Sequence, residues 1–330
     1  MSLDPARRAG LERSRATAIA RDHFDVDLTT AEVSSAPFGV VVAVAERAVI
    51  VSSSPDLAVL GGVLVWSARN PRATLDLVVE HHGGVHARRA AVLAPEIKVH
   101  VLDGARLAPA SAAPFEPPHA TPGDVAPLVA MIERSGADVV VEDGIVRAEV
   151  AGLEVGRVVT GPSGSALEVG VGRFDREAGV LLHSGRPVES TLVDTIDKVH
   201  EHRRPGVPGH PINRIGRERW LRAIVLADPG RFEVASVQAV EPVPPRTSLL
   251  DTRPAALVGR CGHRSTLVVC TVGADLGLIP EVCDLVAVHQ PEMVRILMPE
   301  RDRLPYLEHL TERVAVATSI DVVVPPWSEA

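Results

Sequence analysis

Two glutamates occupy matching positions in neighbouring apolar stretches of the chain. The sequence Leu-Glu-Val-Gly occurs at residues 153–156 and again at 167–170. Side chains alternate between the two faces of a β-strand, so each strand would place its glutamate and the following glycine on one face. Two carboxylates beside open backbone could bind a divalent cation such as Mg²⁺ or Mn²⁺, or act as general acid and base. Glu154 and Glu168 are therefore the candidate catalytic and metal-binding residues, and the enzyme class would be a metal-dependent hydrolase.

A structural alternative accounts for the same two acids. Antiparallel sheets commonly expose one face to water, and Glu154 and Glu168 would then lie on a solvated face without a chemical role. The helix and acidic strands of this region also resemble the core of the PD-(D/E)xK nucleases, in which strand acids and a lysine hold the metal. That resemblance implies a nuclease-like phosphodiesterase. Gly170 stands where that family carries its lysine, so no catalytic residue is transferred from it.

The most basic part of the chain follows an antiparallel meander that is predicted over residues 139–173. Residues 202–222 contain six arginines and one glutamate. Pro211 suits the first turn of a helix, where free backbone N–H groups favour an anion. Arginine side chains bind phosphate oxygens in pairs, which predicts a phosphate-bearing ligand such as a nucleotide or a nucleic acid. The candidate ligand-binding residues are Arg203, Arg204, His210, Arg214 and Arg219.

One of these arginines has a second interpretation. On a helical wheel Arg219 falls on the apolar face, in the same arc as Ile212 and Trp220. A buried arginine needs a carboxylate partner or a bound anion. If the partner is an acid of the meander, the acids and arginines form one internally neutralised network. The chain would then be a non-catalytic scaffold or protein-interaction protein.

A secondary candidate site lies where a parallel strand is predicted to end and a helix to begin. Ligands of open α/β sheets bind at the carboxyl ends of strands. Two glycines there would admit a phosphate, and histidines with a glutamate could bind a transition metal. In the alternative interpretation the histidines are exposed residues of an ordinary turn. The site comprises Glu80, His81, His82, Gly83, Gly84 and His86.

Composition narrows the classes of function. The formal net charge of −8 argues against a surface that binds polyanions throughout. Lys98 and Lys198 are the only lysines, which leaves few lysine-dependent mechanisms open. Three cysteines without paired spacing predict no disulfide framework, and the residue bias is typical of a bacterial protein. With no signal peptide and no run of about 20 apolar residues, we expect a cytoplasmic protein without a membrane partner; a homo-oligomer stays open.

The order of predicted elements indicates the fold class. Strands alternate with helices over residues 39–102 and 266–324, which predicts parallel βαβ units at both ends and an internal structural repeat. Between them, helices and an antiparallel meander over residues 139–173 predict an α+β segment. Helices are expected at 188–202 and from about Pro211 onward.

Proline-rich stretches set the predicted boundaries. The predicted segments are 1–108, α/β with an Arg-rich N-terminal helix; 109–123, a linker; 124–240, α+β with the acidic meander and basic helix; 241–254, a linker; and 255–330, α/β and able to pack with the first segment.

Overall fold

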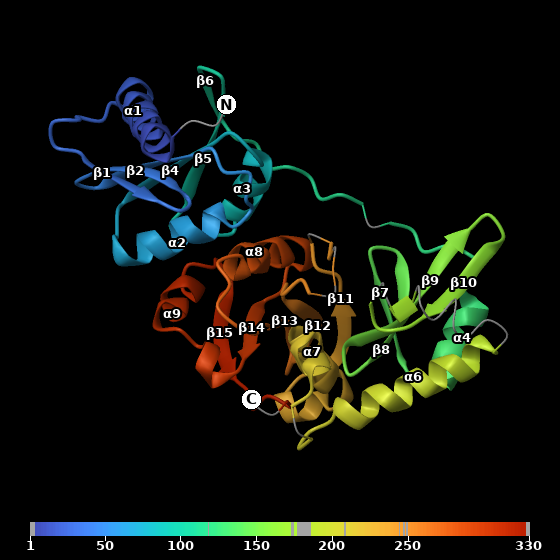
Figure 1. The fold of residues 1–330 in the computed structure, drawn as a ribbon. Helices are drawn as coiled ribbons and strands as arrows, with labels where there is room; N and C mark the ends of the chain where they lie inside the picture. Colours follow the sequence, from blue (N-terminus) through green and yellow to red (C-terminus); the bar gives the residue numbers. More distant parts are fainter. Residues whose placement is uncertain are drawn as a thin grey trace. The chain divides into compact units, whose positions relative to one another are not determined.

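The chain has two compact units. The computed structural model describes residues 4–117, 119–172, 175–176, 186–207, 209–243, 245–246, 248 and 250–327. The first unit comprises residues 1–115, 274–290 and 304–319, and the second comprises residues 116–273, 291–303 and 320–330. Both combine helices with strands, in agreement with the predicted α/β class (Figure 1). In the described part, every helix is too short or too polar to cross a membrane.

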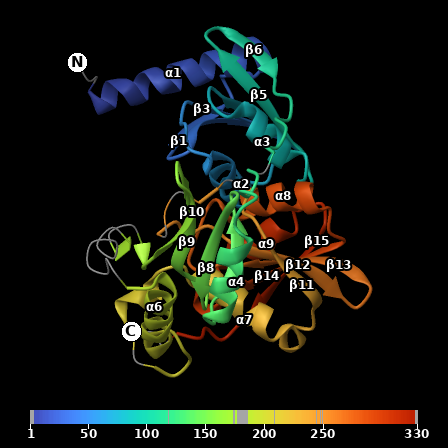
Figure 2. The same ribbon diagram turned by 90° about the vertical axis from the view of Figure 1, so that its right-hand side faces the viewer.

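A six-stranded mixed sheet forms the centre of the first unit. Its strands follow the chain in the order β1-β2-β3-β4-β5-β6. Parallel pairing is confined to β3, β4 and β5, and the remaining pairs are antiparallel. Helices α1 and α2 cover opposite faces of this sheet (Figures 1 and 2). The elements are α1 (Pro5–Phe24), β1 (Glu32–Ala36), β2 (Gly39–Val44), β3 (Arg47–Ser52), α2 (Val59–Arg69), β4 (Thr74–Val79), α3 (Gly83–Ala90), β5 (Ile97–Asp103) and β6 (Arg106–Pro109).

Helix α1 begins where the sequence caps it. The Asp4 side chain accepts a hydrogen bond from the backbone N–H of Arg7 at 3.4 Å, and proline occupies the first turn. Ala16, Ile19 and Ala20 are buried against the sheet. The arginines of α1 are exposed, so this helix offers a basic surface in an acidic protein.

Four helices pack together in the first unit. Helices α8 (Leu278–His289) and α9 (Pro305–Thr311) contact α2, and α8 also contacts α3. The fully buried Asp284 of α8 accepts from Nε of Arg88 at 2.9 Å and from Nε of Arg89 at 2.7 Å. A charge-assisted pair of bonds therefore fixes α3 against α8. The segments after α3 and α9 also pair, through an antiparallel bridge between Leu93 and Val314.

A four-stranded antiparallel sheet and two helices form the middle of the second unit. The strand order is β10-β9-β8-β7. Helices α4 and α6 pack together over a core that includes Ile132, Val150, Leu153 and Ile196. The meander was predicted to extend to Arg173; β10 ends at Val169, and Arg173 lies outside the described residues. The elements are α4 (Ala126–Arg134), β7 (Asp138–Glu142), β8 (Ile145–Val150), β9 (Leu153–Gly161), β10 (Gly164–Val169) and α6 (Val188–His202).

A β-bulge changes the predicted alternation along β9. Glu149 pairs with Glu154 and Ala148 with Gly156, so Val155 is an extra residue in this strand. Val158 therefore joins Leu153 in the apolar core. Strict alternation along residues 153–158 predicts that Arg157 lies on the face opposite Glu154. This prediction is wrong, because the bulge brings both side chains to one face.

Most strands of the last sheet belong to the second unit. Its order is β11-β12-β13-β14-β15, with antiparallel pairs from β11 to β13 and a parallel pair between β13 and β14. The helix predicted from Pro211 is instead a short 3₁₀ helix, and α7 begins only after Gly216, whose φ is 57°. The elements are η1 (Pro211–Arg214), α7 (Arg217–Ala227), η2 (Pro229–Phe232), β11 (Ala235–Val240), β12 (Ala255–Cys261), β13 (Arg264–Cys270), β14 (Met293–Met298), η3 (Glu300–Asp302) and β15 (Ala317–Val322).

The first and last sheets repeat one order of elements. In each, a helix precedes three antiparallel strands, and two helices then alternate with two further strands; the first sheet adds β6 after these. The register of the parallel pairs also matches, because Val51 lies opposite Val78 as Cys270 lies opposite Leu297. Val51 therefore corresponds to Cys270, and Val78 corresponds to Leu297.

The turns that follow these strands match as well. Asp56 and Asp275 each accept a hydrogen bond from the backbone N–H two residues later, just before α2 and α8 begin. Counting from these anchors, Ser52 corresponds to Thr271 and Ser53 to Val272.

Candidate functional site

Glu154 is surrounded by arginine side chains. Its carboxylate is fully buried. Oε2 accepts from Arg147 at 3.0 Å, and Oε1 accepts from Arg157 at 2.7 Å and from Arg176 at 2.8 Å. Three guanidinium groups on one carboxylate leave both oxygens occupied and oppose the approach of a cation. The alternative in which Glu154 decorates a solvated face is wrong, because the residue has no exposed surface.

Glu168 lies on the same face of the meander, but Arg157 stands opposite it across the β9–β10 pair. Its side chain is 39% exposed, and its Oε2 lies 3.8 Å from Nε of Arg176. The glycine expected to leave open backbone is covered as well, since a Cβ on Gly170 would lie 2.8 Å from the backbone nitrogen of Arg176. Within the described ranges, no group of three or more His, Cys, Asp or Glu residues could hold a metal ion.

A second cluster of buried charges joins the meander to α7. Glu149 accepts from Arg219 at 3.3 Å and from Arg222 at 3.1 Å. Glu142 accepts from Arg222 at 3.0 Å and from Arg246 at 2.8 Å. The ion pair predicted between Arg219 and an acid of the meander is confirmed.

The charge of Glu142 follows from this cluster. Burial by itself would raise the pKa of Glu142, but the charges of Arg246 and Arg222 outweigh burial and lower the pKa to about 2. Its carboxylate therefore stays ionised inside the protein at neutral pH.

Arg203 is a structural arginine. It donates to the carbonyl oxygens of Ala151 at 2.9 Å and Gly216 at 2.9 Å, and it also bonds those of Ile212 and Ile215. Its guanidinium lies over the ring of Trp220, 4.5 Å from the centroid. Burial lowers the pKa of Arg203 to about 9, and the charge of Arg219 adds to the effect. The guanidinium therefore fixes the segment that connects α6 to α7 through hydrogen bonds to its carbonyl oxygens.

The other candidates of the basic segment are exposed. Arg204, His210 and Arg214 lie on the surface. His210 stacks on His202 with ring centroids 4.1 Å apart, and its Nδ1 accepts from the backbone N–H of Ile212. Arg203 and Arg219 are buried, so the five predicted ligand-binding residues do not share one accessible surface.

The secondary candidate site is spread around the start of α3. His81 and His82 are exposed, whereas His86 is fully buried with both ring nitrogens unpaired among the described residues. Packing explains both glycines, because a Cβ on Gly83 would lie 2.3 Å from Val101 and one on Gly84 would lie 2.9 Å from Ala113. Within the part of the chain that the structure describes, Glu80 is the member of this site that forms an ion pair, with Arg15 of α1.

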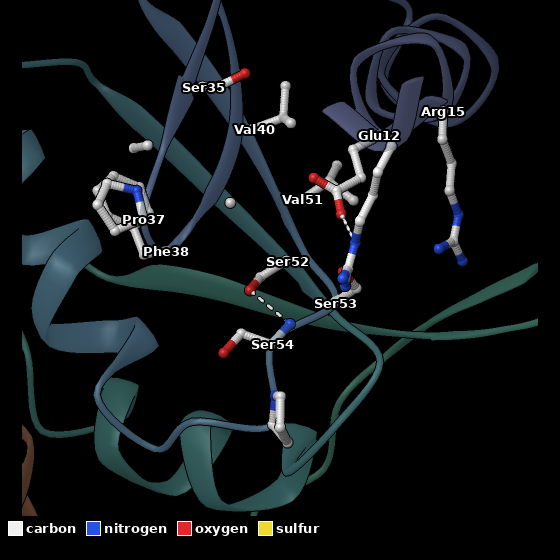
Figure 3. A pocket seen from close by; sticks show the side chains of 14 residues that line it. Glu12, Arg15, Ser35, Pro37, Phe38, Val40, Val51, Ser52, Ser53 and Ser54 are labelled. Atoms are coloured by element: carbon white, nitrogen blue, oxygen red, sulfur yellow. Dashed lines mark hydrogen bonds and ion pairs between the residues drawn. The ribbon is translucent and has the colours of Figure 1, made fainter. Parts of the chain in front are cut away.

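Arg15 also lines a pocket in the first unit. The pocket has a volume of about 290 Å³ and lies between α1, the β1–β2 turn and the end of β3. Three consecutive serines, Ser52, Ser53 and Ser54, line one side, and Glu12 and Arg15 of α1 lie on another (Figure 3). Apolar residues complete the lining: Pro37, Phe38, Val40, Val51 and Pro55.

Two arginines bring positive charge to this pocket. Arg8 and Arg15 both line it from α1. Arg8 also contacts Glu12 through Nε at 3.1 Å, and Arg15 pairs with Glu80. These pairs are more than 40% exposed on the arginine side, so water screens them and they hold the side chains weakly. An anion entering the pocket could exchange with the carboxylates.

The serines supply neutral hydrogen-bonding groups. Ser52 is buried and accepts from the backbone N–H of Ser54 at 3.3 Å, whereas Ser53 is exposed. Hydroxyl and guanidinium donors are the groups that contact phosphate oxygens in proteins. Ser52 is the last residue of β3, and Ser53 and Ser54 follow it. Because β3 is parallel to β4, the serines lie at the carboxyl end, where α/β sheets bind ligands.

Comparison with protein-family models, with curated proteins and with solved structures finds no match to this chain.

Sequence reasoning missed the residues of this pocket. Three serines directly after the apolar stretch 48–51 were a usable signal, because they mark the end of the first strand of a βαβ unit. The sequence places Arg8 and Arg15 only in an Arg-rich N-terminal helix. Their approach to the serines depends on how α1 packs on the sheet, and no local pattern encodes that packing.

Proposed function

We propose that this protein binds a phosphate-bearing ligand in the pocket between α1 and the end of β3. The observation that carries the proposal is the pairing of two arginines with three consecutive serines around a cavity of about 290 Å³. Pockets for small ligands begin near this size, and a few polar groups among apolar walls fix the ligand's orientation. Arg8 and Arg15 would take the charge, and the serine hydroxyls would bind the remaining oxygens.

The test is ligand-induced thermal stabilisation. Inorganic phosphate, AMP and ATP are added at millimolar concentration to the full chain, with sodium chloride at the same ionic strength as the reference. A ligand that binds only the folded state raises stability by RT ln(1 + [L]/Kd). We expect a rise in Tm for the unmodified protein that is lost in Arg15→Ala and reduced in Ser53→Ala.

Arg21→Ala is the matched control. Arg21 lies on the same helix, is exposed, and pairs with Asp22 rather than lining the pocket. Phosphate salts also stabilise proteins without binding a site, and this effect would persist in every variant. Equal shifts in Arg15→Ala and Arg21→Ala, or a flat response of the unmodified protein, would contradict the proposal.

A second candidate function, that of a non-catalytic scaffold, is favoured for the second unit. Glu142, Glu149 and Glu154 each contact at least two guanidinium groups. Glu142 and Glu149 thereby hold α7 on the meander, and Glu154 joins β8 and β9 to Arg176. If this is their role, Glu154→Gln should lower stability and leave the ligand-induced shift of the first unit unchanged.

A further inference from the structure

The internal repeat offers a second view of the ligand pocket. The pocket of the first repeat lies between α1 and the end of β3, beside Val51, Ser52 and Ser53. By register, the equivalent place in the last repeat lies between α7 and the end of β13, beside Cys270, Thr271 and Val272. One fold therefore presents the same location twice, and the two locations can be compared.

In the last repeat this location is filled by the chain itself. Trp327, which follows β15, is buried and packs on Trp220 of α7 with ring centroids 5.6 Å apart. Both rings belong to the same apolar cluster as Cys270, and Val272 and Val323 pack at its edge. The guanidinium of Arg217 lies 4.9 Å from the centroid of the Trp327 ring. A peptide segment beyond the last strand thus occupies the space beside α7.

The first repeat keeps the location open and changes its chemistry. Val51 and Ser53 replace Cys270 and Val272, and the charged Arg8 and Arg15 of α1 line the space instead of an indole ring. An apolar segment such as residues 323–327 would bury these groups without partners, which is unfavourable. The segment that fits must carry negative charge and several acceptor oxygens.

We infer that the open pocket of the first repeat receives an extended phosphopeptide of a partner protein, seated as the segment ending at Trp327 is seated in the last repeat. The inference rests on the proposed function, since it names the class of molecule that bears the phosphate. A phosphorylated side chain brings three acceptor oxygens and a charge near −2 to a pair of arginines. The apolar walls formed by Pro37, Phe38 and Pro55 contact the rest of the peptide.

A peptide-retention experiment tests this. The immobilised full chain is incubated with nine-residue pools that have random flanks around phosphoserine, phosphothreonine or phosphotyrosine, and with the same pools lacking phosphate. A defined probe copies residues 321–327 with phosphotyrosine in place of the tryptophan, and its unphosphorylated tyrosine form is the matched control. Inorganic phosphate and AMP are titrated as competitors.

We expect phosphorylated peptides to be retained at least tenfold over their unphosphorylated forms, and the best of them to bind at least tenfold more tightly than inorganic phosphate or AMP. Arg15→Ala should remove this preference, and Arg21→Ala should keep it. If AMP or inorganic phosphate binds as tightly as every phosphopeptide, the peptide inference is overturned while the proposed function stands. If neither phosphate nor any phosphopeptide binds, both fail.

Discussion

Arg157 donates from Nε to Glu154 Oε1 at 2.7 Å, although the two residues lie three positions apart on one strand. In a regular strand this spacing would direct them to opposite faces. The bulge at Val155 brings them to the same face, and Arg147 and Arg176 complete the shell. The carboxylate of Glu154 is therefore neutralised by the three arginines around it.

Removing this acid should be costly. Glu154→Gln leaves three guanidinium groups facing a neutral side chain, and we expect the free energy of unfolding to fall by about 3 kcal/mol. Glu168→Gln is the control, because its carboxylate is 39% exposed, and its loss should stay within about 0.5 kcal/mol. Denaturant unfolding measures both. Equal losses would show that the three guanidinium groups do not depend on the charge of Glu154. Stabilisation of the unmodified protein by Mg²⁺ or Mn²⁺ that Glu154→Gln abolishes would support a metal site instead.

Glu142 should make stability depend on acid pH. Its ordinary pKa of 4.5 is lowered to about 2 in the folded protein. The unfolded chain therefore binds this proton first, so the contribution is complete above pH 4.5 and disappears as the pH falls toward 2. The stability difference between the unmodified protein and Glu142→Gln should shrink by about 3 kcal/mol over this window. A constant difference from pH 7 to pH 2 would show that the carboxylate is not held by Arg222 and Arg246.

The turn between β8 and β9 should not tolerate a side chain. Gly152 has a φ of 74°, and a Cβ there would lie 2.3 Å from the carbonyl carbon of Arg219. We expect Gly152→Ala to lower the free energy of unfolding by about 3 kcal/mol, because backbone strain and a clash with α7 combine. Gly104→Ala, at a φ of 60° with no neighbour within 4 Å, isolates the strain and should lose about 1 kcal/mol. Similar losses at both sites would mean that α7 does not abut this turn.

Two buried threonines of β13 and its end should respond in opposite ways. The Thr271 hydroxyl is buried and has no hydrogen-bond partner among the described residues. The Thr266 hydroxyl donates to the carbonyl of Arg264 and accepts from the backbone N–H of Cys261, both at 3.1 Å. Thr271→Val should be neutral or stabilising, and Thr266→Val should lose about 1 to 3 kcal/mol. Thermal unfolding compares them, and the reverse order would show that the Thr271 hydroxyl is hydrogen-bonded in solution.

His86 should lower the free energy of unfolding in mild acid. Burial, with the charge of Arg89, lowers its pKa from 6.5 to about 4. Between these values the unfolded chain binds a proton that the folded protein excludes, so stability falls as the pH drops from 6.5 to 4. His86→Leu should remove about 3 kcal/mol of this loss. An unchanged pH profile in the variant would mean that His86 is solvated.

Much of the fold could be predicted from the sequence because local patterns specify it. Alternating strands and helices predicted the βαβ units at both ends, and glycine-containing turns predicted the antiparallel meander. The apolar arc of the helix predicted from about Pro211 also indicated that Arg219 is buried with a carboxylate or an anion as its partner, and the structure shows Glu149 in that place. Each of these inferences depends on residues that are neighbours along one element.

The tertiary structure decided what local patterns do not encode. A single extra residue in β9 moved Arg157 beside Glu154, and residues 175–176 covered the glycine that looked open. The packing of α1 on its sheet brought Arg8 and Arg15 to three serines that are distant in sequence. The sequence by itself determined the alternation of strands and helices at both ends of the chain and the antiparallel hairpins of the meander. Which charges meet was decided only by strand register and helix packing, because contact between groups far apart in the chain depends on the position of whole elements.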